Sequence, residues 1–101
     1  MDGFSLETPE KVGKTLAARV KALRLARGWK QITLARRSGV SLGSLRRFEE
    51  SGRVSLQNLL ELAFALNRLD DFDALLQPPP ASSLAELEAA EKRPARKRGR
   101  I

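Results

Sequence analysis

The sequence predicts an all-α fold of five helices followed by a basic tail. Apolar residues recur at helical spacing, capping residues stand before these runs, and no stretch carries a strand signal. At 101 residues the chain is long enough for one compact domain and too short for two of ordinary size. We expect an N-terminal arm over residues 1–8, a helical domain over 9–77, and a proline break with a basic tail over 78–101.

The first two helices are predicted from their boundary residues. Thr8 as N-cap and Pro9 at the first helical position begin a long helix with one apolar stripe, which ends at Gly28. A short helix is expected over residues 31–38, and Gly39 lets the chain turn after it.

Three more helices follow in the same way. Ser41 is expected to cap a third helix that runs to about Glu50. Ser55 is expected to cap a fourth, whose apolar residues cover more than one face and place it at the centre of the core. After a left-handed residue at Asn67, Asp70 is expected to cap a short fifth helix. This last helix would carry Phe72, Leu75 and Leu76.

The proline run after these helices ends the regular structure, because consecutive prolines cannot extend a helix. Ser83 and Glu86 then have capping-box spacing, which predicts one or two helical turns over residues 84–92. Leu84 and Leu87 would be available there to a partner. The final residues have no apolar pattern and are expected to be disordered alone.

The composition excludes most catalytic chemistry. Without cysteine and histidine, the chain cannot supply thiolate or imidazole metal ligands, a cysteine nucleophile or a histidine base. We therefore expect no enzymatic activity, no catalytic residues, no metal and no cofactor. No apolar run approaches the ~18–20 residues of a membrane span, and the N-terminus lacks the basic and apolar regions of a signal peptide. These features predict a soluble, cytoplasmic protein that does not contact a membrane.

Charge is segregated along the chain. Residues 11–53 hold twelve basic and two acidic residues, whereas residues 54–91 hold one basic and seven acidic residues. Residues 92–101 are basic again. A concentrated basic field attracts a polyanion, while an acidic half fits either a protein partner or simple solubility.

Residues 31–50 have the pattern of a helix-turn-helix unit, with a tight turn at Gly39 and Val40. Ala35 is small enough for the two helices to cross closely, and Val40 and Leu45 are expected to fill the gap between them. An α-helix fits the major groove of DNA, so such a turn can present the first residues of the second helix to base edges. The pattern therefore predicts binding to double-stranded DNA, and with it a nucleoid-associated location in the cytoplasm.

The unit and its flanks resemble the phage-repressor-like, or XRE, family of helix-turn-helix domains. The stretches that carry the resemblance are RVKALRLARGWKQ, LARRSGVS and SLRRFEE, within residues 19–66. The resemblance implies a five-helix phage-repressor-like domain that contacts bases through four residues, which are Ser41, Leu42, Gly43 and Arg47. It also implies phosphate contacts by Gln31 and Ser44, and an Arg24–Glu49 pair that orients Arg24 beside a phosphate.

The chain departs from that family at two places. Lys30 stands where relatives have a Ser or Thr N-cap and Thr33 where they have the Glu of the capping box, which costs about 1 kcal/mol of helix capping. Lys30 can instead reach a phosphate. One residue is inserted after the recognition helix, at residues 49–52, so the contacts of Arg53 stay open.

Two neighbouring arginines receive different assignments, because adjacent helical residues point about 100° apart. We assign Arg47 to a guanine in the groove and Arg46 to a phosphate. The alternative is that both are solvated, or that one pairs with Glu50. Leu42 is expected to contact thymine methyl groups, and Gly43 to permit close approach of the backbone.

Aromatic and apolar residues outside this unit have less specific predictions. Trp29 is expected to pack at the exit of the first helix, with base stacking as the alternative. Phe64, Leu69 and Phe72 form a candidate dimer surface, because three large apolar groups are hard to hide in so small a domain.

The basic tail is a second candidate contact with DNA. Arg96, Lys97, Arg98 and Arg100 belong to RKRGR, residues 96–100, which resembles the Arg-Gly-Arg core of AT-hook peptides that enter the minor groove, although Ile101 stands where those peptides have a proline. The alternatives are sequence-independent attraction to phosphates and contacts with a protein partner.

A narrower resemblance concerns the HipB-type antitoxins. It rests on LETPEKVGKTL, on FEESGRVSLQNLLELAFALNRLDDFDALL, and on the proline break before a basic tail. It implies a homodimeric repressor that binds its own operator DNA and holds a HipA-type serine/threonine kinase toxin. The alternative is a stand-alone or phage regulator of the XRE type without a toxin. An RNA-binding role is disfavoured, because the chain lacks an aromatic stacking platform.

Overall fold

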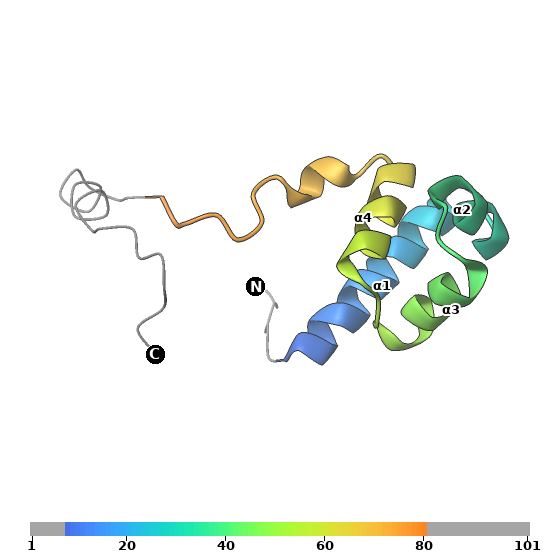
Figure 1. Cartoon of the computed structure of the whole chain (residues 1–101), viewed down its shortest axis with the longest axis horizontal. Helices are drawn as coiled ribbons and strands as arrows, with labels where there is room; N and C mark the ends of the chain where they lie inside the picture. The colour runs from blue at the N-terminus through green and yellow to red at the C-terminus, as the bar shows by residue number, and fades with distance from the viewer. Residues whose placement is uncertain (1–7, 81–101) are drawn as a thin grey trace.

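The computed structural model describes residues 8–80, which form helices and connecting loops without a strand. Four α-helices follow one another, namely α1 (Pro9–Ala26), α2 (Gln31–Ser38), α3 (Leu42–Ser51) and α4 (Leu56–Ala65). A single 3₁₀ turn, η1 (Leu69–Phe72), follows α4, and the chain then runs away from the helices as far as Pro80 (Figure 1). The predictions for the tail beyond Pro80 and for the arm before Thr8 lie outside the described residues.

The helix boundaries follow the predicted caps. Thr8, Ser41 and Ser55 each accept a hydrogen bond through the side-chain oxygen, at 3.1, 3.1 and 3.0 Å, from the backbone N–H three residues later. Lys30 precedes α2 without a side-chain cap, as its residue type predicts. Gly39 ends α2 in the left-handed conformation that lets the chain turn toward α3.

The prediction of a fifth α-helix was wrong. Asn67 is left-handed as predicted, with φ at 59°, but Asp70 lies inside a 3₁₀ turn that has no side-chain cap. Leu75 and Leu76 are exposed, so no packing surface stabilises further helical turns. Leu76 also has a positive φ of 61°, which interrupts a helix shortly before the prolines.

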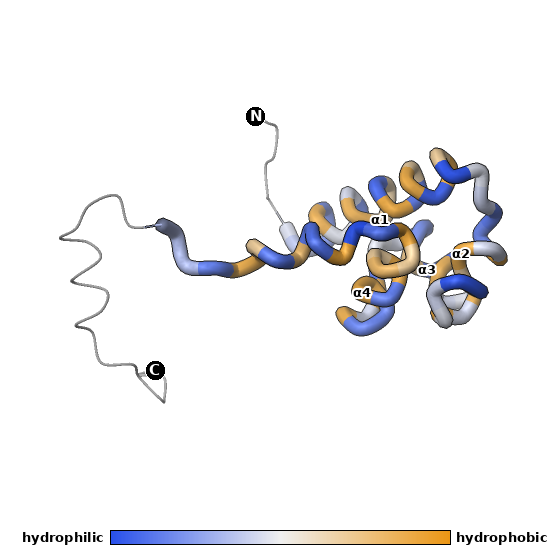
Figure 2. Tube along the Cα trace, turned by 90° about the horizontal axis from the view of Figure 1, so that it is seen from above, coloured by the Kyte–Doolittle hydropathy of each residue, from blue (hydrophilic) through white to orange (hydrophobic). Residues whose placement is uncertain are grey.

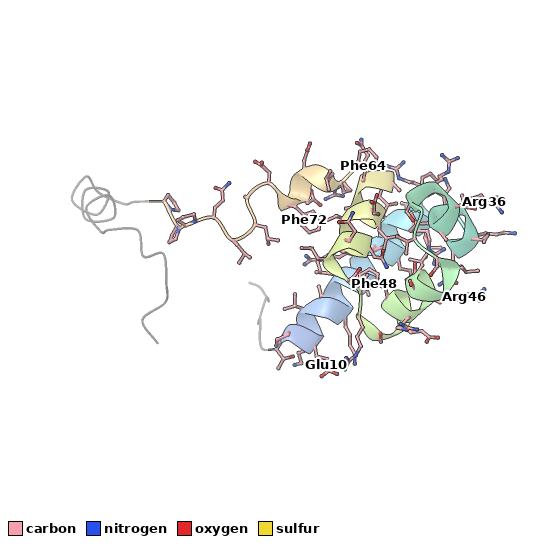
Figure 3. The ribbon with its side chains drawn as sticks, in the orientation of Figure 1. Glu10, Arg36, Arg46, Phe48, Phe64 and Phe72 are labelled. Carbon is pink, nitrogen blue, oxygen red and sulfur yellow. The ribbon has the colours of Figure 1, made fainter. Side chains whose placement is uncertain are left out.

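The core lies between the four helices. Along α1, polar and apolar residues alternate, as expected for a helix with one face on the core (Figure 2). Phe48 of α3 is fully buried in this core (Figure 3). The other large side chains that are fully buried are Leu34, Leu45, Leu62 and Leu66. Val40 and Leu45 are 4% and 0% exposed, which confirms that they fill the space beside the turn.

The backbone of α1 comes very close to the end of α3 at two glycines, Gly13 and Gly52. A Cβ atom on Gly13 would lie 2.6 Å from the carbonyl oxygen of Gly52, and a Cβ atom on Gly52 would lie 2.6 Å from the carbonyl carbon of Gly13. Gly52 also has a positive φ of 81°, which favours glycine. Neither position has room for a side chain, so this contact sets how closely the two helices pack.

Replacing Gly13 with alanine is expected to lower the free energy of unfolding by about 1–3 kcal/mol, because the new methyl group forces the two backbones apart. Gly43→Ala is the matched control, since no atom lies within 4 Å of a Cβ atom there. It should leave stability unchanged or raise it by up to about 1 kcal/mol. Urea unfolding measures both variants, and equal effects would contradict the packing argument.

Candidate nucleic-acid interface

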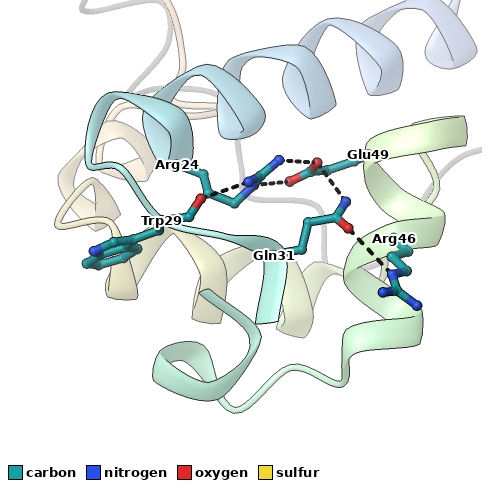
Figure 4. Close-up of polar contacts among 5 residues, drawn as sticks. All are labelled: Arg24, Trp29, Gln31, Arg46 and Glu49. Carbon is teal, nitrogen blue, oxygen red and sulfur yellow. Dashed lines mark hydrogen bonds and ion pairs between the residues drawn. The ribbon is translucent and has the colours of Figure 1, made fainter. Parts of the chain in front are cut away.

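A buried ion pair joins α1 to the recognition helix α3. Arg24 donates from Nε to Oε2 of Glu49 at 2.8 Å and from Nη2 to Oε1 at 2.9 Å (Figure 4). Its Nη1 donates to the carbonyl oxygen of Trp29 at 2.8 Å. The side chains of Arg24 and Glu49 are only 7% and 5% exposed. The pairing implied by the family resemblance is therefore confirmed, and all three guanidinium nitrogens have acceptors.

Gln31 connects this pair to Arg46. Its Nε2 donates to Oε1 of Glu49 at 3.0 Å, which leaves its Oε1 to accept from Nε of Arg46 at 3.4 Å (Figure 4). The network therefore runs from α1 through the start of α2 to the exposed surface of α3. Arg46 bonds to Gln31 and not to Glu50, and the terminal nitrogens of its guanidinium stay available to a ligand.

The start of α3 exposes little polar surface. Ser41 donates from Oγ to Oγ of Ser44 at 2.9 Å, so the two hydroxyl groups already contact each other. Leu42 is half-buried against the core. Gly43 is exposed, with open space where a side chain would lie. A ligand could therefore approach the backbone closely at Gly43.

Arg47 lies on the exposed side of α3, beside a shallow hollow of about 330 Å³. The hollow brings Arg47 together with Arg53 of the next loop and Asn58 of α4. The sequence did not decide whether Arg53 contacts DNA, and it gave no indication that Asn58 lies at this site. Arg53 could have been suspected because it follows the glycine that ends the recognition helix, whereas no sequence signal places Asn58 there.

Trp29 packs where α1 ends, as predicted. The guanidinium carbons of Arg27 and Arg37 lie 5.1 and 4.6 Å from its ring centroid, within the range of cation–π contacts. Arg27 also donates from Nη2 to the carbonyl oxygen of Leu66 at 2.7 Å, at the end of α4. Trp29 therefore packs between an arginine at the end of α1 and an arginine of α2, a pair of contacts that the sequence did not predict.

Several exposed cations belong to α2 and α3. Arg36 of α2 and Arg46 of α3 lie at the end opposite the outgoing chain (Figure 3). Arg37, Arg47 and Lys30 are exposed on the same two helices or immediately before them. The carboxylate of Glu49 is directed at Arg24 and does not neutralise these groups. This end therefore has a positive field suited to a polyanion.

The helix-turn-helix family matches residues 20–72, more than half of the chain. The protein belongs to the XRE-type helix-turn-helix family. It is a DNA-binding transcriptional regulator of this type, and such domains are usually non-enzymatic. No curated protein and no solved structure matches the chain significantly. The matched segment begins inside α1, so the XRE match does not include the first half of that helix or Gly13.

Over residues 8–80, no helix has the length and apolar character needed to cross a membrane. The same residues contain no group of three or more acidic side chains placed to hold a metal ion.

Glu49→Gln is expected to lower the free energy of unfolding by about 3–5 kcal/mol, because it leaves the charge of Arg24 buried without a counterion. Asp71→Asn is the control. It removes an ion pair with Arg68 whose side chains are 48% and 53% exposed, and it should cost less than about 1 kcal/mol. Chemical denaturation followed by circular dichroism compares the two, and a similar small loss in both would refute the role of the buried pair.

Proposed function

We propose that this regulator is a repressor that binds an operator as a homodimer. The residues assigned to base contacts are Ser41, Leu42, Gly43 and Arg47, and those assigned to phosphate contacts are Lys30, Gln31, Ser44 and Arg46. Arg24, which the resemblance places beside a phosphate, is buried in its pair with Glu49 and would act through that pair. The observation that carries the proposal is the contrast between the two neighbouring arginines. Arg46 donates a long hydrogen bond of 3.4 Å to Gln31, while the side chain of Arg47 has no partner within residues 8–80.

The contrast supports separate roles for the two side chains. Gln31 lies at the start of α2, where the resemblance implies a phosphate contact, and Arg46 shares that neighbourhood through its hydrogen bond. Arg47 is free to direct both terminal nitrogens at the acceptors of a guanine. The exposed Gly43 lets the backbone of α3 come close to the groove. Sequence discrimination then depends chiefly on Arg47.

Arg47→Ala is expected to weaken binding to the preferred DNA site by about 1–3 kcal/mol and to relax the preference over random DNA. Lys30→Ala is the matched comparison, because it removes an exposed cation just before α2. It should weaken binding to all DNA sequences equally, and it should reduce by about one the slope of the logarithm of the binding constant against the logarithm of the salt concentration. The preferred site is first selected from random DNA, and affinities are then measured over a range of salt. An equal loss on both DNAs for Arg47→Ala would overturn the base contact.

The outer face of α4 supports the homodimer. Leu56, Leu60 and Phe64 recur every four residues, and Leu56 and Phe64 are 64% and 66% exposed. Leu69 of η1 adds a side chain that is 42% exposed. An exposed apolar stripe of this kind is typical of a protein interface. A two-fold dimer would read two half-sites about one helical turn or a multiple apart.

An antitoxin role is the finer form of this proposal. Its support is the resemblance to HipB-type proteins, together with exposed carboxylates at the end of the domain, on Asp70, Asp71 and Asp73. This acidic part would bind a HipA-like serine/threonine kinase, while α3 binds the operator. A stand-alone or phage regulator without a toxin is the competing assignment.

The antitoxin role predicts a kinase-like gene beside the gene for this chain. Its product, co-expressed with the tagged full chain, should co-purify with it, and Asp70→Lys/Asp71→Lys/Asp73→Lys should reduce the yield of the complex at least about tenfold through like-charge repulsion. DNA binding by the same variant is the control, since α3 is unchanged. A lone gene, or a neighbouring kinase that does not bind, would leave only the stand-alone regulator.

A further inference from the structure

An apolar groove of about 460 Å³ lies between α1 and α4 on the side bordered by η1. Leu16 and Leu23 of α1 face Leu59 of α4 across it, and Phe72 of η1 completes this part of the lining. The groove is distinct from the exposed stripe of Leu56, Leu60 and Phe64, none of which lines it.

The charged groups at the groove are not balanced. Arg68 is paired with Asp71 at 2.9 Å, so this cation already has a counterion. Arg19 also lines the groove, and its exposed guanidinium has no partner within residues 8–80. The groove therefore fits an occupant that carries apolar side chains beside carboxylates.

One segment outside the described residues has this chemistry. Residues 84–91 read LAELEAAE, and they place leucines at helical i, i+3 spacing among three glutamates. Residues 92–101 are strongly basic and would be repelled by Arg19. The N-terminal arm is a poorer match, because Phe4 and Leu6 would have to turn back along α1 for two helical turns before reaching Leu16.

The segment can also reach the groove. Twelve residue steps separate Phe72, which lines the groove, from Leu84. A connection of that length spans up to about 40 Å when extended, and the entropy of closing it rises only slowly with length. The connection includes the prolines at residues 78–80, which restrict the unfolded chain and reduce the entropy lost on docking.

We propose that residues 84–91 dock in the groove between α1 and α4 of their own chain. Leu84 and Leu87 pack on the apolar walls, and the glutamates lie beside Arg19. This inference goes beyond DNA binding and does not depend on it. Docking would hold Lys92, the first residue of the basic tail, close to the helical domain and raise the local concentration of the tail there.

The absence of native cysteine allows a direct test by disulfide trapping in the full chain. Ala22→Cys places a thiol at the groove, and it is combined with Ala85→Cys or Ala90→Cys on either edge of the segment. Lys21→Cys is the matched control, because Lys21 is equally exposed on α1 but does not line the groove. At least one Ala22 pair should form an intramolecular disulfide about tenfold faster than its Lys21 counterpart.

The double substitution Leu84→Asp/Leu87→Asp, added to the same cysteine pairs, should abolish the difference in the rate of disulfide formation between the Ala22→Cys and Lys21→Cys pairs. Mass spectrometry and non-reducing gels distinguish the products. Disulfide-linked dimers would show that a second copy supplies the segment, and equal rates for Ala22 and Lys21 would show that nothing docks. Either result overturns the proposal. The measurement is made without DNA. A negative result would therefore contradict docking only, and the proposed repressor function would still be tested separately by DNA binding of the Arg47→Ala and Lys30→Ala variants.

Discussion

The position of the recognition helix α3 in the candidate nucleic-acid interface depends first on the buried ion pair of Arg24 and Glu49. An ionised side chain inside a protein is tolerated only when a counterion and hydrogen bonds replace its hydration. Glu49 serves Arg24 with both oxygens and also accepts from Gln31, so one carboxylate links α1, the start of α2 and α3. The recognition helix is consequently held by an ion pair whose loss would leave the buried guanidinium of Arg24 without a counterion.

A second constraint is steric and acts close to the first. Gly52 follows Glu49 by three residues and touches the backbone of Gly13. The later part of α3 is thus fixed to α1 both by charge and by close packing, while its first turn carries neither restraint and remains accessible. Gly13 precedes the segment matched by the XRE family, so this second restraint involves a residue outside that match.

The helix caps were predictable from neighbouring residues, whereas contacts between distant residues were predicted only where the family resemblance implied them. The caps at Thr8, Ser41 and Ser55 are local, because a hydroxyl group bonds to an amide three residues away. The failed fifth helix had suitable capping chemistry but no surface for its leucines to pack on. In the site, the resemblance implied the pair of Arg24 and Glu49. The bond from Arg46 to Gln31 joins residues fifteen apart in sequence and has no local signature.

The same network bears on how two adjacent arginines could differ in binding DNA. A side chain loses rotamer freedom when a ligand immobilises it, and that loss weakens binding. Arg46 is already restrained through Nε by Gln31, so less freedom remains to be lost at a phosphate. Arg47 has no such restraint within residues 8–80. The entropy lost when Arg47 is ordered is therefore offset only where a base offers two well-placed acceptors. In the proposed complex Arg46, which is partly restrained, would therefore favour any DNA, whereas Arg47, which has no side-chain partner within residues 8–80, would favour particular sequences. With so few hydrogen-bonding groups on the first turn of α3, the sequence-dependent shape of the DNA would supply much of the remaining selectivity.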